Sequence, residues 1–179
     1  MLLKKKWLAY VLGLSLLCVL NFSELRGQNG FIPYVSLSAG LSYTGVNTYL
    51  NVGGNFRRHS IYIGPKIVAS QSFFPGKTLW GVNAGYAYRL LEQHNWTMQV
   101  NLDYQNAIYQ SPSTTNYIHE IAGAFCLNFF PHSPRFSIFA NMGANIYIEN
   151  YYDSYSASRA SNSGLAPSVK IGLAYNLRK

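Results

Sequence analysis

The feature that most constrains the fold is the stretch from Trp96 to Ile108, in which hydrophobic and polar residues alternate. The hydrophobic positions share one parity, with Asn106 as the exception: Trp96, Met98, Val100, Leu102, Tyr104 and Ile108. The polar positions share the other: Thr97, Gln99, Asn101, Asp103 and Gln105. A period of two predicts a β-strand with one hydrophobic and one polar face. About ten residues of tilted strand cross a bilayer, so this strand is long enough to do so.

The same alternation recurs along the rest of the chain and predicts eight strands, at residues 34–43, 48–57, 60–69, 78–91, 96–108, 117–130, 135–150 and 165–177. One rule of alternation throughout predicts an all-β fold, a closed antiparallel up-and-down barrel, because closure leaves no unpaired edge. Pro65 lies within the third strand, where it removes a ladder hydrogen bond. A bulge or bend is therefore expected at Pro65.

The polar face distinguishes a membrane barrel from a soluble, lipocalin-like one. Charged residues make up only 11% of the chain and aromatic residues 16%, whereas a soluble surface carries roughly 25–35% charged residues. The polar parity is mainly Ser, Gly, Asn, Gln and Ala, which suits a crowded interior better than a solvated surface. Aromatic residues gather near the strand ends, as in interfacial girdles, with Tyr43, Trp80 and Tyr117 at one end. The sequence therefore predicts a transmembrane barrel.

The first 27 residues have the pattern of a cleaved signal peptide. Lys4, Lys5 and Lys6 precede an apolar run at 7–20, which is short for a membrane-spanning helix. Cleavage after Gly27 would leave 28–179 as the barrel domain. A lipoprotein signal at Cys18 is the alternative, but Leu16 and Leu17 stand where such signals need small residues. Cys126, the cysteine left after cleavage, is interpreted as a packed small residue rather than a reactive thiol.

The lengths of the connections predict an orientation. Residues 44–46, 70–77, 110–116 and 151–164 would lie at one end, and the shorter segments 57–59, 92–95 and 131–134 at the other with both termini. Short periplasmic turns and longer outer loops are typical of bacterial outer-membrane barrels. The second set is therefore predicted to be periplasmic.

Six charged residues fall on the inward parity, three of each sign. Hairpin register puts Lys66, Asp103, Glu120 and Lys170 near one level, and we expect them to form a buried charge cluster because buried charges persist only when paired. Arg89 and Glu149 are the other two interior charges. The alternative interpretation of the cluster is a conducting or proton-relay path.

The mature chain resembles the small eight-stranded bacterial outer-membrane barrels, such as the transmembrane domain of outer-membrane protein A and the outer-membrane protein X type. Besides the strand pattern, the resemblance rests on the last strand, where Lys170, Gly172, Tyr175 and Leu177 have the spacing of that family's assembly signal. The family usually ends on an aromatic residue, whereas Arg178 and Lys179 follow here. The resemblance implies a Gram-negative outer membrane, with its lipids and the barrel assembly machinery as partners.

Function is expected at the outer loops. Candidate contacts to another outer-membrane protein or a surface ligand are Phe73, Phe74, Tyr151, Tyr152, Tyr155 and Arg159. We expect a structural, adhesive or accessory protein with a filled interior and no cofactor or metal; a narrow, porin-like channel is the alternative, and a lipid A-modifying enzyme the third. His119 is the one histidine near the outer end, and His59, His94 and His132 lie in separate turns. Basic residues form no stripe interleaved with aromatics, so no nucleic-acid partner is expected.

Overall fold

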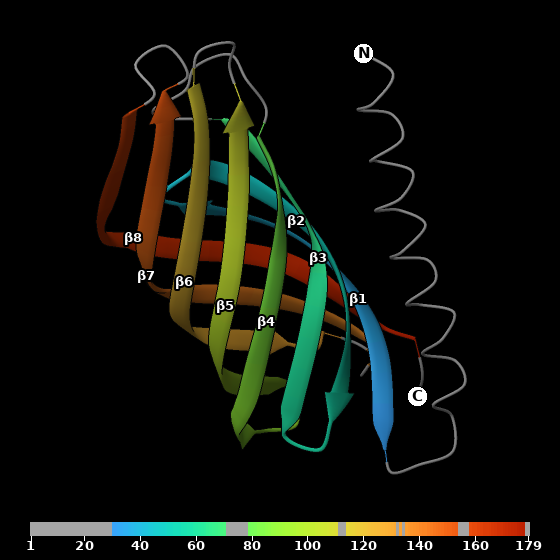
Figure 1. Cartoon of the computed structure of the whole chain (residues 1–179). Coiled ribbons are helices and arrows are strands. Elements are labelled where there is room, and N and C mark those ends of the chain that lie inside the picture. Colours follow the sequence, from blue (N-terminus) through green and yellow to red (C-terminus); the bar gives the residue numbers. More distant parts are fainter. Residues whose placement is uncertain are drawn as a thin grey trace, which may run out of the picture.

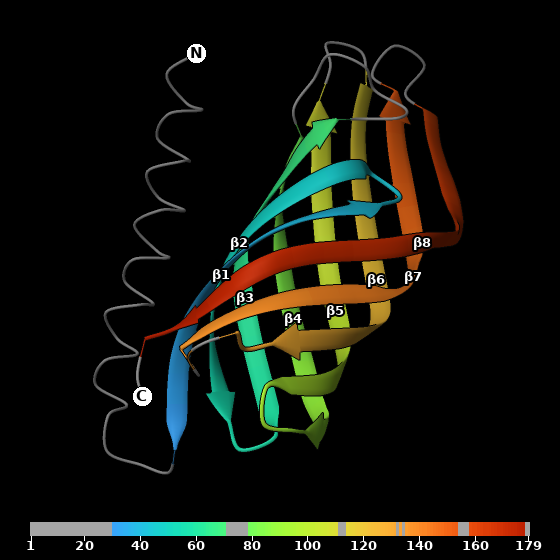
Figure 2. The same cartoon turned by 180° about the vertical axis from the view of Figure 1, so that it is seen from behind.

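The structure, a computed structural model, is a closed antiparallel barrel, described for residues 30–70, 79–110, 114–131, 133, 135–153 and 158–177. Its strands are β1 (Phe31–Ser42), β2 (Gly45–Phe56), β3 (His59–Ser70), β4 (Leu79–Glu92), β5 (Trp96–Gln110), β6 (Thr114–Phe129), β7 (Phe136–Asp153) and β8 (Ser158–Asn176). Each strand pairs with the next, and β8 returns to β1 (Figures 1 and 2). The predicted eight-stranded up-and-down fold is therefore confirmed. The predicted signal peptide lies outside the described residues.

The two ends of the barrel differ. The end where β1 begins and β8 ends, here called the terminal end, also holds the turns at 57–58 and 93–95. The opposite end, called the loop end, holds the Tyr43–Thr44 turn and the outer parts of β6, β7 and β8. No helix within the described ranges is long and apolar enough to cross a membrane.

The prediction of a long loop at 151–164 is wrong. Strands β7 and β8 have 18 and 19 residues and stay paired out to Asp153 and Ser158. This part of β8 is rich in Ser, Asn and Ala and lacks hydrophobic alternation. Where neither face of a hairpin is buried, its two strands can pair without alternating hydrophobic residues. The sequence of this part of β8 therefore carries no strand signal.

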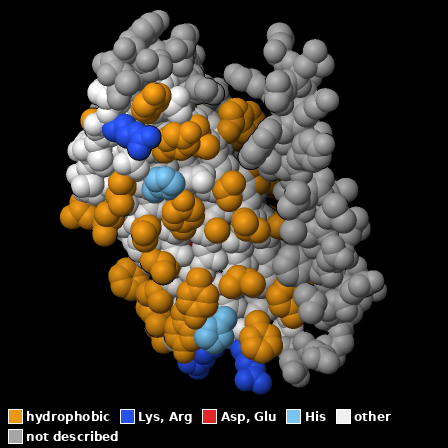
Figure 3. Space-filling view, in the orientation of Figure 1, with side chains coloured by type: hydrophobic (Ala, Val, Ile, Leu, Met, Phe, Trp, Pro, Cys, Tyr) orange, Lys and Arg blue, Asp and Glu red, His pale blue; other side chains and the backbone are white. Residues whose placement is uncertain are grey.

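The two faces of each strand are sorted as the alternation predicts. On β5, Leu102 is 57% exposed and Asn101 is 8% exposed. On β7, Ile138 is 39% exposed and Asn141 is 5% exposed. Hydrophobic side chains cover the outer face, with Lys and Arg toward its two ends (Figure 3). The molecule is thus hydrophobic outside and polar inside, the reverse of a soluble protein.

Pro65 interrupts the pairing of β3 with β2 without shifting its register. Tyr49 pairs with Lys66 and Val52 with Ile63 in the same register, and the pairing skips Pro65 between them. On its other side Pro65 pairs with Val82 of β4. Register shifts occur instead between Val46 and Asn47, and between Arg89 and Leu91. The predicted bulge is therefore not found at Pro65, and the alternative of a bend there stays a prediction.

Asn106, the polar exception on the outward parity of β5, has a local structural role. Its Oδ1 accepts a hydrogen bond of 2.7 Å from the backbone N–H of Val82 on β4. The side chain thus satisfies a backbone donor on a face that is otherwise hydrophobic, where an unpaired N–H would cost free energy.

Candidate functional site

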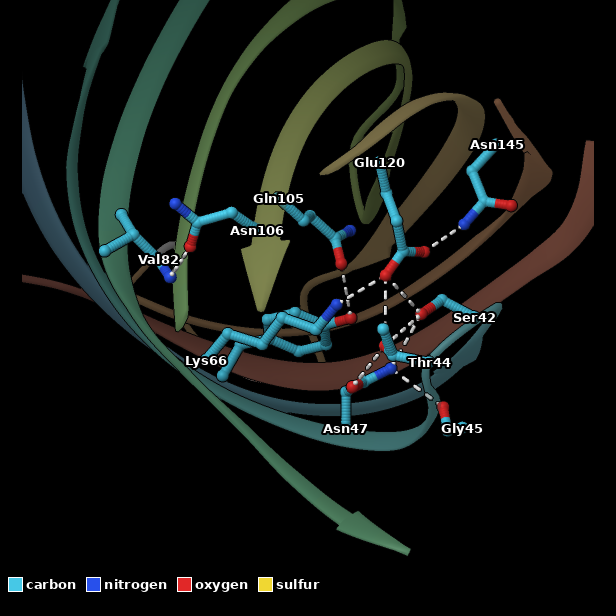
Figure 4. A network of polar contacts seen from close by, with 11 residues as sticks. Ser42, Thr44, Gly45, Asn47, Lys66, Val82, Gln105, Asn106, Glu120 and Asn145 are labelled. Carbon is cyan, nitrogen blue, oxygen red and sulfur yellow. Dashed lines mark hydrogen bonds and ion pairs between the residues drawn. The ribbon is translucent and has the colours of Figure 1, made fainter. Parts of the chain in front are cut away.

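The most connected group in the interior is the carboxylate of Glu120, on β6. Its Oε1 accepts from Lys66 Nζ at 2.7 Å, from Thr44 Oγ1 at 3.0 Å and from Ser42 Oγ at 3.2 Å. Its Oε2 accepts from Nδ2 of Asn145 on β7. Figure 4 shows these donors converging on Glu120 from β1, from the turn that follows it, from β3 and from β7. The Lys66 and Glu120 side chains are both 0% exposed, so this ion pair is fully buried.

A second ion pair lies farther from the loop end. Lys170 Nζ on β8 donates to Asp103 Oδ2 on β5 at 2.9 Å, and Tyr62 donates to Asp103 Oδ1. Lys170 Nζ also lies 4.3 Å from the ring centroid of Tyr49, whose hydroxyl donates to Gln105 Oε1 at 2.9 Å. The structure therefore places all four residues of the predicted cluster in two buried ion pairs, Lys66 with Glu120 and Lys170 with Asp103.

The remaining interior charges lie apart from these pairs. Arg89 Nη1 binds Glu92 Oε2 at 2.9 Å near the terminal end, with 21% and 65% of the side chains exposed. Glu149, at the loop end, accepts from Tyr43 at 2.8 Å, Tyr151 at 2.7 Å and Asn116 at 3.3 Å. The sequence-based placement of Tyr43 in the lipid-facing girdle is wrong, because its hydroxyl turns inward to the buried carboxylate. Desolvation, followed by this hydrogen bond, raises the pKa of the Tyr43 phenol.

A cluster of buried hydrophobic residues lies in the interior toward the loop end. The cluster consists of Val68, Leu79, Ala107 and Ile118, with Tyr43 packed against it. Each of the four is at most 2% exposed. Sequence reasoning missed this layer, although a signal was present: Val68 follows Lys66 by two positions and Ile118 precedes Glu120 by two, so both share the inward parity.

The other half of the barrel is hollow. A cavity of about 880 Å³, here called the vestibule, is lined at its mouth by terminal-end residues such as Gly30, Asn95 and Phe130. It reaches inward to Tyr62 and Lys170. Its walls carry small inward residues, among them Ser36, Ser60, Ala87 and Ala174, that are too short to meet across the barrel. The expectation of a filled interior therefore holds for the loop half only.

Three of the predicted loop contacts lie on paired strand ends rather than in a loop. Tyr151, Tyr152 and Arg159 line a second cavity of about 570 Å³ with Thr115, Tyr117, Asn150, Ala160 and Ser161. The guanidinium of Arg159 lies 6.0 Å from the ring centroid of Tyr152. Phe73, Phe74 and Tyr155 lie outside the described residues.

The predicted assembly signal lies on the last strand. Tyr175 and Leu177 are exposed on the outside, whereas Lys170 and Gly172 face inward. A Cβ on Gly172 would lie 2.5 Å from Cβ of Ser38, so this position accepts only glycine without rearrangement. Recognition by the assembly machinery stays a prediction.

The histidines that the structure describes give no combined site, and His132 lies outside the described residues. His119 Nδ1 lies 2.8 Å from the Tyr104 hydroxyl on the outer face, while its neighbour Glu120 points inward. His59 Nδ1 lies 2.6 Å from the Tyr86 hydroxyl at the terminal end. No three His, Cys, Asp or Glu side chains group as metal ligands within the described part of the chain.

Comparisons with solved structures return outer-membrane proteins at low identity. A major outer membrane protein from Thermus thermophilus is similar with a TM-score of 0.44 and 13% identity, covering 83% of this chain and 100% of that one. Neisserial surface protein A is similar with a TM-score of 0.43 and 8% identity, covering 82% of this chain and 96% of that one. The outer membrane protease OmpT from Escherichia coli is similar with a TM-score of 0.29 and 9% identity, covering 82% of this chain and 95% of that one. No family model matches the chain, and no curated protein matches it significantly. The assignment of the fold therefore rests on the strand pairing itself, which makes the chain an eight-stranded antiparallel barrel.

Proposed function

We propose that the chain is a structural or accessory protein of a bacterial outer membrane, exported by its signal peptide. The observation that carries this proposal is the hydrophobic outer surface of a closed barrel whose charges are paired inside. Closure satisfies the backbone hydrogen bonds of every strand, which is the condition for crossing lipid without a helix. Outward residues such as Leu102, Phe125 and Ile171, each at least 57% exposed, would then contact acyl chains.

The terminal end would face the periplasm, and the extended β7–β8 hairpin would project from the cell. A labelling experiment tests this orientation. Arg57→Cys and Arg159→Cys, each made in a Cys126→Ala background, are exposed at opposite ends. A membrane-impermeant maleimide should label the Arg159→Cys variant in intact cells and the Arg57→Cys variant only after the outer membrane is opened. Labelling of the Arg57→Cys variant in intact cells would reverse or refute the orientation.

The interior supports a sealed barrel rather than a pore. Going inward from the loop end, an ion would meet the apolar cluster of Val68, Leu79, Ala107 and Ile118, and then two buried ion pairs. An unsolvated ion cannot pass such a layer without a large desolvation cost. Refolded protein in planar bilayers should therefore show no steady single-channel conductance. The vestibule favours the second candidate, a narrow channel, and reproducible conductance steps would establish it in place of the sealed barrel.

Contacts with a partner are proposed at the loop end. The cavity beside Tyr117, Tyr152 and Arg159 combines aromatic rings, an exposed guanidinium and polar side chains, a composition that suits adaptable contact surfaces. Affinity isolation from gently solubilised outer membranes tests the role. A bound outer-membrane protein or surface ligand should be retained by wild type and by the control Arg57→Ala, and lost by Tyr152→Ala/Arg159→Ala. Equal recovery with all three proteins would contradict the contact surface.

A further inference from the structure

The vestibule has the size and opening of a ligand site. Its volume of about 880 Å³ lies within the range of roughly 300–1,000 Å³ that is usual for small-molecule sites. Its lining extends from Gly30, Arg57 and Phe130 at the terminal end to Lys170 at the inner end. A ligand can therefore enter from the terminal end of the barrel.

Inside its rim, the charged side chains around the vestibule form two ion pairs. Arg89 binds Glu92 near the mouth and Lys170 binds Asp103 at the inner end, both at 2.9 Å. Arg57 lies at the rim, and the lining holds no further Lys, Arg, Asp or Glu side chain. An anionic ligand would have to compete with Glu92 or Asp103 for its cations. The walls therefore favour an uncharged ligand.

The wall also presents polar side chains. Asn101 and Asn141 both line the cavity, and a side-chain amide can donate as well as accept hydrogen bonds. Further lining amides and hydroxyls belong to Gln99, Asn128 and Ser137. A purely hydrocarbon ligand would leave all of these polar groups desolvated.

Aromatic rings share the same cavity with these polar groups. Tyr34, Tyr62 and Phe139 line it from β1, β3 and β7. Aromatic faces pack against apolar C–H surfaces, while amides and hydroxyls bind hydroxyl groups. Sugars carry both kinds of surface on one ring. We propose that the vestibule binds a short, uncharged oligosaccharide.

Two sources share this chemistry: a glycan of N-acetylated amino sugars, as in a cell wall, and a free neutral oligosaccharide. The test uses the full mature chain refolded in an amine-oxide detergent, because sugar-based detergents would compete. Titration calorimetry with chitotriose, maltotriose and inorganic phosphate compares the two sources with an anion. Saturable one-to-one binding of either sugar, tighter than phosphate, is expected. Preference for chitotriose indicates the amino-sugar glycan, and preference for maltotriose the free oligosaccharide.

Variants localise the binding. Ala174→Trp fills the vestibule from β8, and its control Ala140→Trp adds the same side chain to the outer face of β7. Sugar affinity should fall at least about ten-fold in Ala174→Trp and stay unchanged in Ala140→Trp. Asn141→Leu keeps the size of the side chain and should also weaken sugar binding about ten-fold. This variant tests the site even if Ala174→Trp does not fold. Heat-dependent gel mobility reports folding of each variant.

The proposal is overturned if neither sugar binds, if phosphate binds more tightly than both sugars, or if folded Asn141→Leu and Ala174→Trp bind sugar as wild type does.

Discussion

Removal of the Glu120 carboxylate should be among the most damaging single changes in the barrel interior. In Glu120→Ala, the ammonium of Lys66 keeps its 0% exposure and loses its acceptor at 2.7 Å. Breaking a buried ion pair by deleting one partner costs about 3–5 kcal/mol, because the other charge remains buried without compensation. Ser42 and Thr44 also lose an acceptor but keep each other at 3.0 Å, so they add little to the cost.

The matched comparison is the partly exposed pair of Arg89 and Glu92, which has nearly the same N–O distance of 2.9 Å. Because Glu92 is 65% exposed, Glu92→Ala should cost at most about 1 kcal/mol. The two ion pairs have similar geometry, so the difference in free energy of unfolding between the two variants reports the effect of burial. The double variant Lys66→Met/Glu120→Leu removes both charges and should recover most of the loss, since apolar replacement of a buried pair is often neutral or stabilising.

Reversible urea unfolding of protein refolded into lipid vesicles, followed by tryptophan fluorescence, measures these free energies of unfolding. The reasoning is refuted if Glu120→Ala costs less than about 1 kcal/mol, the upper range for exposed pairs, or if the double variant is as unstable as the single one.

Three further outcomes follow from the same interior and surface. Asp103→Ala should destabilise the barrel by about 3–5 kcal/mol in the same urea assay and be largely rescued by Lys170→Met, whereas unchanged unfolding would contradict the second buried pair. Gly143→Ala should lower the free energy of unfolding by on the order of 1–3 kcal/mol, because the new Cβ would lie 1.9 Å from the backbone O of Gly123. In the control Gly123→Ala the new Cβ meets nothing within 4 Å, so this variant should be as stable as wild type. Equal unfolding midpoints for the two variants would refute this. Lipid A mass spectra should be the same with and without the gene, and a modified species that depends on it would establish the enzyme alternative.

The alternation of hydrophobic and polar residues predicted which way most side chains point, because a strand has only two faces. Once Trp96 to Ile108 is read as a strand, Leu102 must face away from Asn101, and the same rule applied to the other strands orders the whole barrel. Pairing of the four central charges followed from the cost of burying any of them alone. Which cation meets which anion did not follow, because that choice depends on the stagger between strands far apart in the chain.

The errors in the sequence-based prediction have more than one physical cause. Beyond the band of hydrophobic outward residues, the alternation no longer marks the strands. The sequence therefore predicts a loop around Asp153 and Ser158, although the backbone at these two residues is paired. The outer girdle was the wrong place for Tyr43 because residue type alone does not distinguish an interfacial tyrosine from one that donates to a buried carboxylate such as Glu149.

By itself the amino-acid sequence determined the number of strands, the face each side chain occupies and the need to pair the interior charges, because these depend on local periodicity and on the cost of burial. Only the tertiary structure decided that the buried ion pairs and the apolar cluster lie toward the loop end, whereas the barrel is hollow at the terminal end. Closing eight strands with their particular stagger brings the long side chains of Tyr49, Lys66 and Glu120 into one half. The same stagger leaves the short side chains of Ser36, Ala87 and Ala174 around the vestibule.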